Sequence, residues 1–292
     1  IFEQMPFPTL AEKDMLECKI LKELFSDAYF AENFAFSGSG SISKSFNLID
    51  RQNSDIDLVC SGFDDIPEDL CVNRLNKFKR KFKYYIFDCV KPKIEDILND
   101  NKFLITTDKD LNTFTSNENR LTLPMIHIFY RSIYGSQVKN ISIEFMPRKY
   151  RAGIISSKTL IPYSTKEQLC QIPTVACEQT FWDKIYALHS YTVSNNQRCR
   201  RHFSRHHYDV AQMANQIQLD DSKILFQDIV DYQRRYTKRN LPNTGSFEQI
   251  QLLPSDNQMQ DKLKQDYKKL SQNFANASTD WQTINDTLIV LN

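Results

Sequence analysis

Hydrophobic residues repeat along this chain with two different periods, which separate a mixed first part from a helical second part. Spacing of three and four residues indicates an amphipathic helix, whereas strict alternation indicates a strand with one buried face. Both patterns occur up to about residue 160, and a capping-box sequence, Thr-Leu-Ala-Glu, opens the first helix. The elements predicted there are helices at 9–25, 41–47 and 67–82, and strands at 34–36, 54–60, 84–89, 121–130 and 138–146.

After about Pro162 the alternating pattern gives way to helical spacing, and we place a domain boundary near residue 160. Residues 91–120 are polar and predict no defined element, while 239–257 contain two prolines and a glycine and predict a loop. The chain is therefore expected to be an α+β protein with a mixed domain at 1–160 and an all-helical domain at 161–292. The helices predicted in the second domain cover 174–191, 197–213, 221–236, 259–274 and 278–291.

The strand expected at 54–60 carries two acids in the run Asp-Ile-Asp-Leu-Val. Alternation places Asp55 and Asp57 on one face, with their carboxylates about 6–7 Å apart. Two like charges at this distance repel unless a cation lies between them, and a divalent cation with oxygen ligands is the usual solution. The Gly38-Ser39-Gly40 turn upstream offers backbone amides to a phosphate. Solvated acids on a strand are the simpler alternative.

A third acid follows on the strand expected at 138–146. Ile141, Ile143 and Phe145 alternate with polar neighbours, so Glu144 points to the face opposite these apolar side chains. On a strand of the same sheet as the two aspartates, Glu144 would be the third carboxylate of a metal site. Its alternative is an ordinary exposed strand residue.

Composition limits the class of protein further. The 37 Lys and Arg residues nearly balance the 36 Asp and Glu residues, so any affinity for nucleic acid must come from local patches. The seven cysteines are scattered and form no Cys-x-x-Cys pair, which favours a reduced, cytoplasmic protein over a disulfide scaffold or zinc site. No apolar run reaches membrane-spanning length, and we expect no membrane partner.

Glu178 and Lys184 stand on the helix expected at 174–191, and the run from Arg205 to Asp209 stands on the helix expected at 197–213. Together with the acids and the glycine-serine turn, these residues resemble the pattern of the AbiEii/AbiGii toxin family of bacterial nucleotidyltransferases. The resemblance covers residues from about 34 to 213, and it departs from the family in having Ser-Gly-Ser-Gly where many relatives have Lys-Gly-Gly-Thr. The matching residues are Gly38-Ser39, Asp55, Asp57, Glu144, Glu178, Lys184 and the run from Arg205 to Asp209.

The resemblance implies a minimal nucleotidyltransferase fold, a small mixed sheet flanked by helices, with a helical domain that closes over the cleft. It implies transfer of a nucleoside monophosphate from an NTP to a hydroxyl group, with release of pyrophosphate. The cofactor would be one or two Mg²⁺ ions, or Mn²⁺. The metal would be held by Asp55, Asp57 and Glu144, with Glu144 alternatively taking the proton of the acceptor. The phosphate contacts would be Gly38, Ser39, Gly40, Ser54, Lys184 and Arg205, with Asp209 orienting Lys184 or the nucleotide. Arg205 and Asp209 could instead be a simple helix ion pair, since they stand four residues apart.

Two basic runs bear on the acceptor. The candidate RNA contacts are Lys79 and Arg80 on the helix expected at 67–82, and Arg198, Arg200 and Arg201 in the second domain. A solvated helix face is the simpler reading of such a run. We expect an RNA acceptor such as tRNA and an antitoxin partner, as for relatives in toxin–antitoxin systems. The alternatives are a protein or small-molecule acceptor, or a module that binds nucleotides without turnover and acts through a partner.

Overall fold

The computed structural model divides the chain into two compact units, residues 1–46 with 52–175 and residues 47–51 with 176–292. The residues that the structure describes are 8–51, 55–63, 71–99, 102–107, 123–135, 137–193, 202–217, 219–237, 241–242, 244, 247–271, 274 and 279–291.

The first unit is built on a seven-stranded mixed sheet with the strand order β3-β4-β5-β2-β1-β7-β6. β2 lies parallel to β5 and antiparallel to β1, and β4 and β5 form the expected antiparallel hairpin. The strands are β1 (Phe34–Ser37), β2 (Asp55–Cys60), β3 (Phe103–Thr107), β4 (Met125–Arg131), β5 (Val138–Pro147), β6 (Ile155–Leu160) and β7 (Cys170–Val175).

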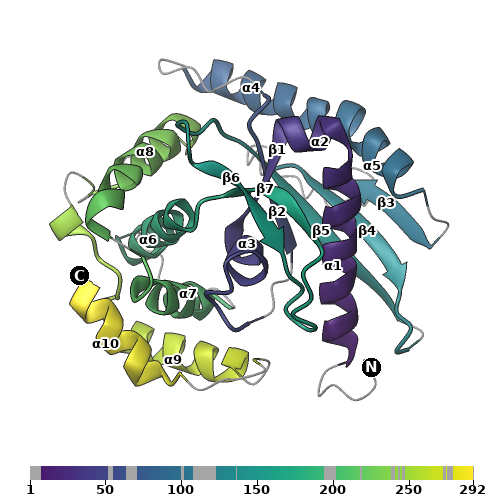
Figure 1. The fold of residues 1–292 in the computed structure, drawn as a ribbon. Helices are drawn as coiled ribbons and strands as arrows, with labels where there is room; N and C mark the ends of the chain where they lie inside the picture. Colours follow the sequence, from purple (N-terminus) through teal and green to yellow (C-terminus); the bar gives the residue numbers. More distant parts are fainter. Residues whose placement is uncertain are drawn as a thin grey trace. The chain divides into compact units, whose positions relative to one another are not determined.

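One face of this sheet carries the main hydrophobic core of the unit. Alternate residues of the central strands point into it, for example Ile56 and Leu58 of β2 beside Ile143 and Phe145 of β5. Helical segments cover this face, and α1 runs across the strands (Figure 1). They are α1 (Pro8–Ser26), α2 (Ala28–Asn33), α4 (Val72–Tyr84), a π-helical segment (Tyr85–Val90) and α5 (Lys91–Ile97). Among the described residues, the opposite face carries a small apolar cluster around Ala35, Val59 and Val175.

The second unit is helical. α6 (Cys177–Val193) is buried along much of its length, and the ring of Trp182 packs on Phe226 and Phe247. The other helices are α7 (Ser204–Ala214), α8 (Leu219–Thr237), α9 (Asn257–Ser271) and α10 (Trp281–Leu291), with a short 3₁₀ turn at Phe247–Gln249.

The α+β class is confirmed, and four local predictions need correction. The strand expected at 84–89 is π-helical, because Ile86, Val90 and Ile94 are buried at four-residue spacing although their β-branched side chains favour strands. The helix expected at 41–47 is α3 (Gly38–Lys44), so the glycine-serine sequence forms its first turn rather than a preceding loop.

The third correction concerns residues after Pro162, where helix was expected. β7 occupies 170–175 and contains Pro173. Proline is uncommon in strands because it has no backbone N–H to donate, so the sequence did not indicate a strand here. Val175 therefore belongs to the sheet, and α6 begins at Cys177. The fourth concerns the region 91–120, which contains α5 and β3 besides residues outside the description. In addition, α1 begins at Pro8, so Thr9 lies inside the first turn instead of capping it.

Two expectations from composition can also be compared with the structure. The described cysteines, six of the seven, all carry free thiols, as expected for a protein without a disulfide framework. Among the described residues, no helix is both long enough and apolar enough to cross a membrane.

Candidate active site

The three acids predicted from the sequence lie on one face of the sheet, opposite the main core. Asp57 of β2 is the register partner of Glu144 of β5, and Asp55 is the register partner of Ser142. Register partners on neighbouring strands are about 4.8 Å apart in the sheet, and residues at i and i+2 share a face. The sequence-based expectation that Glu144 joins the face of the aspartates is therefore confirmed by the strand pairing.

Gly38 is packed directly against the acidic face. Its φ angle is +68°, and a Cβ built at this position would lie 1.9 Å from Oδ2 of Asp57. Both the backbone conformation and the space therefore require glycine. The chain reaches this point from β1, where Ser37 is the register partner of Asp57 and donates a hydrogen bond from Oγ to its carbonyl oxygen at 3.3 Å. The first turn of α3 thus begins beside an acid.

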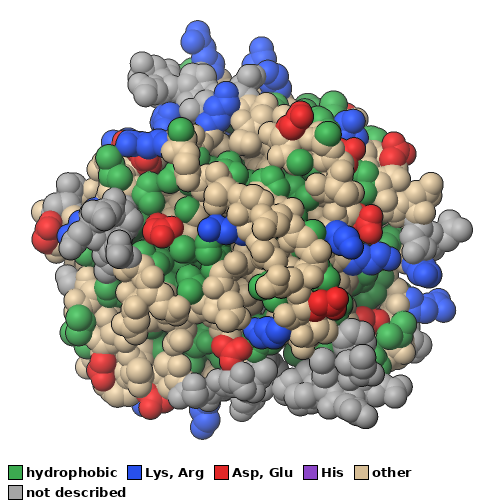
Figure 2. Space-filling view, in the orientation of Figure 1, with side chains coloured by type: hydrophobic (Ala, Val, Ile, Leu, Met, Phe, Trp, Pro, Cys, Tyr) green, Lys and Arg blue, Asp and Glu red, His purple; other side chains and the backbone are tan. Residues whose placement is uncertain are grey.

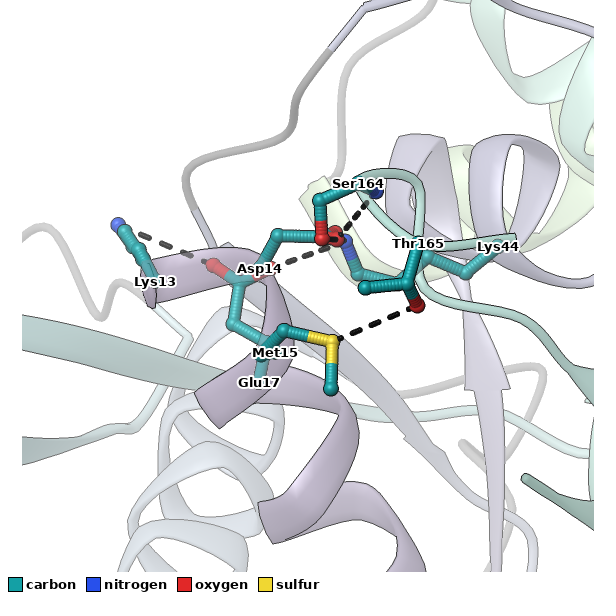
Figure 3. A network of polar contacts seen from close by, with 7 residues as sticks. All are labelled: Lys13, Asp14, Met15, Glu17, Lys44, Ser164 and Thr165. Carbon is teal, nitrogen blue, oxygen red and sulfur yellow. Dashed lines mark hydrogen bonds and ion pairs between the residues drawn. The ribbon is translucent and has the colours of Figure 1, made fainter. Parts of the chain in front are cut away.

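The other end of α3 is fixed by a buried ion cluster, Lys44 with Asp14 and Glu17 of α1 (Figure 3). The ammonium of Lys44, 2% exposed, lies 2.5 Å from Asp14 Oδ1 and 3.2 Å from Glu17 Oε2. Asp14 Oδ2 also accepts hydrogen bonds from the backbone N and the Oγ of Ser164. The backbone N of Ile161 donates to the carbonyl of Lys44 at 2.8 Å. The position of α3 relative to the acids is therefore held by charged groups that water does not reach.

Burial affects the two acids of this cluster differently. Burial raises the pKa of Glu17, and the nearby charge of Lys44 only partly offsets that effect. Burial also acts to raise the pKa of Asp14, but Lys44 and the hydrogen bonds from Ser164 outweigh it, so that pKa is lowered. Asp14 is thus the ionised partner of Lys44, and Glu17 is the acid that takes up a proton more readily.

The chemistry of the acidic face suits a hard cation, because its candidate ligands are carboxylate oxygens. Among the residues that the structure describes, no group of three or more His, Cys, Asp or Glu side chains is placed to hold a metal ion. The three-carboxylate site stays a prediction. Mg²⁺ commonly uses one or two carboxylates and completes its shell with phosphate oxygens and water. The paired aspartates of β2 meet that smaller requirement.

A second charged cluster lies inside the helical unit and joins three side chains. Asp209 of α7 is completely buried, and its Oδ2 lies 2.7 Å from the ammonium of Lys184 on α6. The guanidinium of Arg51 binds both oxygens of the same carboxylate, with Nε at 2.7 Å from Oδ1 and a terminal nitrogen at 2.5 Å from Oδ2. The expectation that Asp209 orients Lys184 agrees with this contact. Asp209 thus forms ion pairs with both cations, Arg51 and Lys184.

The cluster changes the protonation of its members. Burial opposes the charged form of Asp209, but Arg51 and Lys184 hold its pKa far below the ordinary value. Burial lowers the pKa of Lys184, Asp209 acts against this, and the positive charges of Arg51 and Arg205 lower it further. Burial, together with the charge of Lys184, keeps the pKa of His206 well below its usual range. His206 is therefore neutral beside this cluster at pH 7.

Two further contacts hold the elements of this cluster in place. The carboxylate of Asp266 accepts hydrogen bonds from the backbone N of Ser204, its Oγ and the backbone N of His202, and so caps the start of α7. The hydroxyl oxygen of Tyr208 accepts a hydrogen bond from the backbone N of Asp50 at 3.2 Å. This bond fixes the segment that carries Arg51.

Of the predicted RNA contacts, the structure describes Lys79 and Arg80, which both lie on α4. α4 packs its apolar side, including Phe82, on the core face of the sheet, which is the face opposite the acids. Lys79 is half-buried and Arg80 exposed on this helix, and Figure 2 shows Lys and Arg side chains projecting where α4 lies in Figure 1. Ser54, Arg198, Arg200 and Arg201 lie outside the described residues.

Sequence reading missed Arg51 and the Lys44 cluster. Arg51 stands in a polar stretch that matches no motif, so nothing in the sequence distinguishes it from a surface arginine. A signal did exist for the Lys44 cluster, because Asp14 and Glu17 share a helix face with the buried Leu21. Acids on the apolar face of a helix indicate a buried partner.

Comparison with known proteins identifies a family. A family model described as nucleotidyl transferase AbiEii toxin, Type IV TA system, matches residues 19–287. Two solved structures from Helicobacter pylori are also similar, one of JHP933 with 12% identity and one described as a putative nucleotidyltransferase with 13% identity. Each has a TM-score of 0.45, and each alignment covers 96% of this chain and 89% of the other. No match is found among curated proteins. Because the family model spans most of the chain, this protein belongs to the AbiEii nucleotidyl transferase toxin family of type IV toxin–antitoxin systems.

Proposed function

We propose that this toxin transfers a nucleoside monophosphate from an NTP to a hydroxyl group of an RNA, such as tRNA, in a Mg²⁺-dependent reaction. The observation that carries the proposal is the strand register that pairs Asp57 with Glu144 on the face that Asp55 shares. Family membership supports the reaction class. The identity of the metal and the acceptor is part of the proposal.

In the proposed reaction an acceptor oxygen forms a bond to the α-phosphorus, and the bond from that phosphorus to the bridging oxygen breaks. Pyrophosphate leaves with the electron pair of the broken bond, and the acceptor hydroxyl loses its proton. Mg²⁺ held by Asp55 and Asp57 would neutralise charge on the triphosphate and on the departing pyrophosphate. Glu144 lies beside Asp57 either as a further oxygen ligand or as the carboxylate that accepts the proton.

The phosphates require positive charge and hydrogen-bond donors. Gly38, Ser39 and Gly40 form the first turn of α3, and the backbone N–H groups of a helix's first turn point toward its N-terminal end. We propose that these amides and Ser54 bind phosphate oxygens, and that Lys184 supplies positive charge, with Arg205 as a further contact. Asp209 holds the ammonium of Lys184 at 2.7 Å and acts as its positioning residue.

The acceptor proposal depends on local basic patches, because the whole chain has a net charge of only +1. In the first unit the candidates are Lys79 and Arg80 of α4, a helix whose sequence contains no acidic residue. In the second unit the candidates are Arg198, Arg200 and Arg201. An RNA backbone matches such patches, and an antitoxin is the protein partner that the family implies.

The test incubates the protein with each α-³²P-labelled NTP, Mg²⁺ and total RNA, and compares wild type with Asp57→Asn. This substitution removes the charge and keeps the side-chain shape beside Gly38. Asp88→Asn is the matched control, since Asp88 is an exposed acid of the same unit. We expect RNA labelling by wild type and Asp88→Asn, a decrease of at least about 100-fold in Asp57→Asn, and no labelling with EDTA.

The other outcomes separate the alternatives. Label in protein or in a small molecule would show that the acceptor is not RNA, while the proposed reaction, transfer of a nucleoside monophosphate, would stand. Absence of transfer with every NTP, together with NTP binding that survives Asp57→Asn, would refute the enzymatic proposal and favour a binding module that acts through a partner.

A further inference from the structure

Arg51 contacts the Asp209 carboxylate more extensively than Lys184 does. Its fork binds both carboxylate oxygens, whereas the ammonium of Lys184 binds one of them. All three side chains are nearly inaccessible to water, with 2% exposure for Arg51, 0% for Asp209 and 6% for Lys184. We propose that Arg51 is a positioning residue for nucleotidyl transfer, which fixes Asp209 so that Lys184 is presented to the phosphates of the NTP. This inference rests on the proposed function.

The geometry of the fork is the first reason. A planar guanidinium that binds both oxygens fixes the orientation of a carboxylate, which a single point charge does not. With Arg51 in place, Oδ2 of Asp209 has one orientation, and the ammonium of Lys184 is set relative to it. Without Arg51 the carboxylate can rotate toward Lys184 alone. A displacement of about 1 Å in a group that contacts the substrate can reduce the rate by about 100-fold.

The charges within the cluster are the second reason. Arg51 and Lys184 bring two positive charges to the one negative charge of Asp209. Because Arg51 shares that carboxylate, the ammonium of Lys184 is less neutralised than in a simple ion pair. A phosphate oxygen is therefore attracted to Lys184 more strongly when Arg51 is present.

The place of Arg51 in the chain is the third reason. Arg51 lies in the short segment 47–51, which belongs to the helical unit although the residues on both sides belong to the sheet unit. Three residues separate it from Asp55, the first acid of β2. The hydrogen bond from Asp50 to Tyr208 holds the same segment. The link between the acidic strand and the Lys184 cluster is thus covalent and short in sequence.

The experiment compares Arg51→Lys and Arg51→Met with wild type in the RNA-labelling reaction, with Arg234→Met as control. Arg234 has a side chain 53% exposed in the same unit, so its variant loses one positive charge outside the cluster. Folding is checked by circular dichroism, and rates are expressed per folded molecule. We expect kcat to fall by about 10-fold in Arg51→Lys and about 100-fold in Arg51→Met. Arg234→Met should keep the wild-type rate.

A pH profile separates positioning from simple stabilisation. The charged groups that act on Lys184 are Arg51, Asp209 and Arg205, with neutral His206 beside them. Removing the charge of Arg51 raises the pKa of Lys184. The decrease of kcat at alkaline pH, the alkaline limb of the pH profile, should therefore move to higher pH in Arg51→Met. It should stay in place in Arg51→Lys, which keeps the charge. A merely structural role would leave this limb unchanged in both variants.

Three results would decide against parts of the scheme. A wild-type kcat in folded Arg51→Lys, or an unchanged alkaline limb in folded Arg51→Met, would overturn the role of Arg51 while leaving the proposed function intact. If Arg51→Met does not fold, the Arg51→Lys comparison decides alone. A wild-type protein that transfers nothing would refute the proposed function. In that case, the affinities of wild type and Arg51→Lys for each Mg-NTP are compared by equilibrium titration. Equal affinities would overturn the role of Arg51 as well.

Discussion

Lys44→Met is the substitution whose effect the structure specifies most fully. It replaces the buried ammonium by an apolar chain of similar length. Asp14 loses its ion pair with Lys44, and Glu17 keeps only the longer pair with Lys13, at 3.9 Å, among its ion pairs with described residues. Removing one partner of a buried ion pair costs about 3–5 kcal/mol. We therefore expect Lys44→Met to lower the stability of the first unit by this amount at pH 7.

The protonation of the two acids sets an upper limit on that cost. An isolated buried carboxylate takes up a proton instead of remaining charged. For each acid, protonation at pH 7 costs about 4 kcal/mol, since the ordinary pKa is near 4 and each pH unit contributes about 1.4 kcal/mol, so the limit for both acids is about 8 kcal/mol. In the variant both acids have folded-state pKa values above their unfolded values. The stability of Lys44→Met relative to wild type is therefore highest below about pH 4, and it decreases as pH rises toward 7.

The assay is amide hydrogen exchange in α1 and α3 together with urea denaturation, at pH 5 and at pH 7. Lys22→Met is the matched control, because Lys22 is an exposed lysine of α1, the helix that carries Asp14 and Glu17, and we expect a change within about 0.5 kcal/mol. The deficit of Lys44→Met should be smaller by about 2 kcal/mol or more at pH 5. A deficit that does not change with pH, or that equals the effect of Lys22→Met, would refute the reasoning.

Two other predictions follow from single contacts. Gly38→Ala should abolish transfer and destabilise the first unit by more than Gly153→Ala does. Both positions have positive φ, but a Cβ at 38 would lie 1.9 Å from Asp57, whereas nothing lies within 4 Å of a Cβ at 153. Equal effects of the two substitutions in urea denaturation would contradict this prediction. Burial lowers the pKa of His207 to about 4, so its neutral form stabilises the helical unit above pH 6.5 and this contribution of about 3 kcal/mol is lost as pH falls toward 4. The fluorescence of Trp281, whose ring lies 5.6 Å from that of His207, reports the transition, and a stability independent of pH between 4 and 6.5 would count against it.

The sequence predicted those elements in which local preference and tertiary burial agree. β2 and β5 alternate cleanly because each has one face in the core, and their pattern also placed the acids on the other face. The segment 84–89 has the same aromatic and β-branched composition, yet its buried residues follow helical spacing into α5. Composition cannot distinguish these cases, since the neighbouring segment decides which residues are buried.

The sequence predicted those residues of the candidate site that belong to a motif with fixed spacing. It did not predict single residues whose partners lie far away in the sequence. Asp209 and Lys184 stand 25 residues apart on two amphipathic helices, and their pairing agrees with the family pattern. Arg51 stands 158 residues from Asp209, and neither periodicity nor composition links the two positions. Such partners become visible only when the fold brings them together.

Both buried clusters raise the same energetic question, because burying ions is costly and an apolar core of equal volume is often at least as stable. Lys44 fixes α3, the helix whose first residue packs against Asp57. Arg51 fixes the carboxylate that holds Lys184. In both places the charged contact stabilises one orientation of a group proposed to bind phosphate, which apolar packing would leave free to vary. These ion pairs are therefore best explained by the geometry that they impose, and stability alone gives no reason for a chain to keep them.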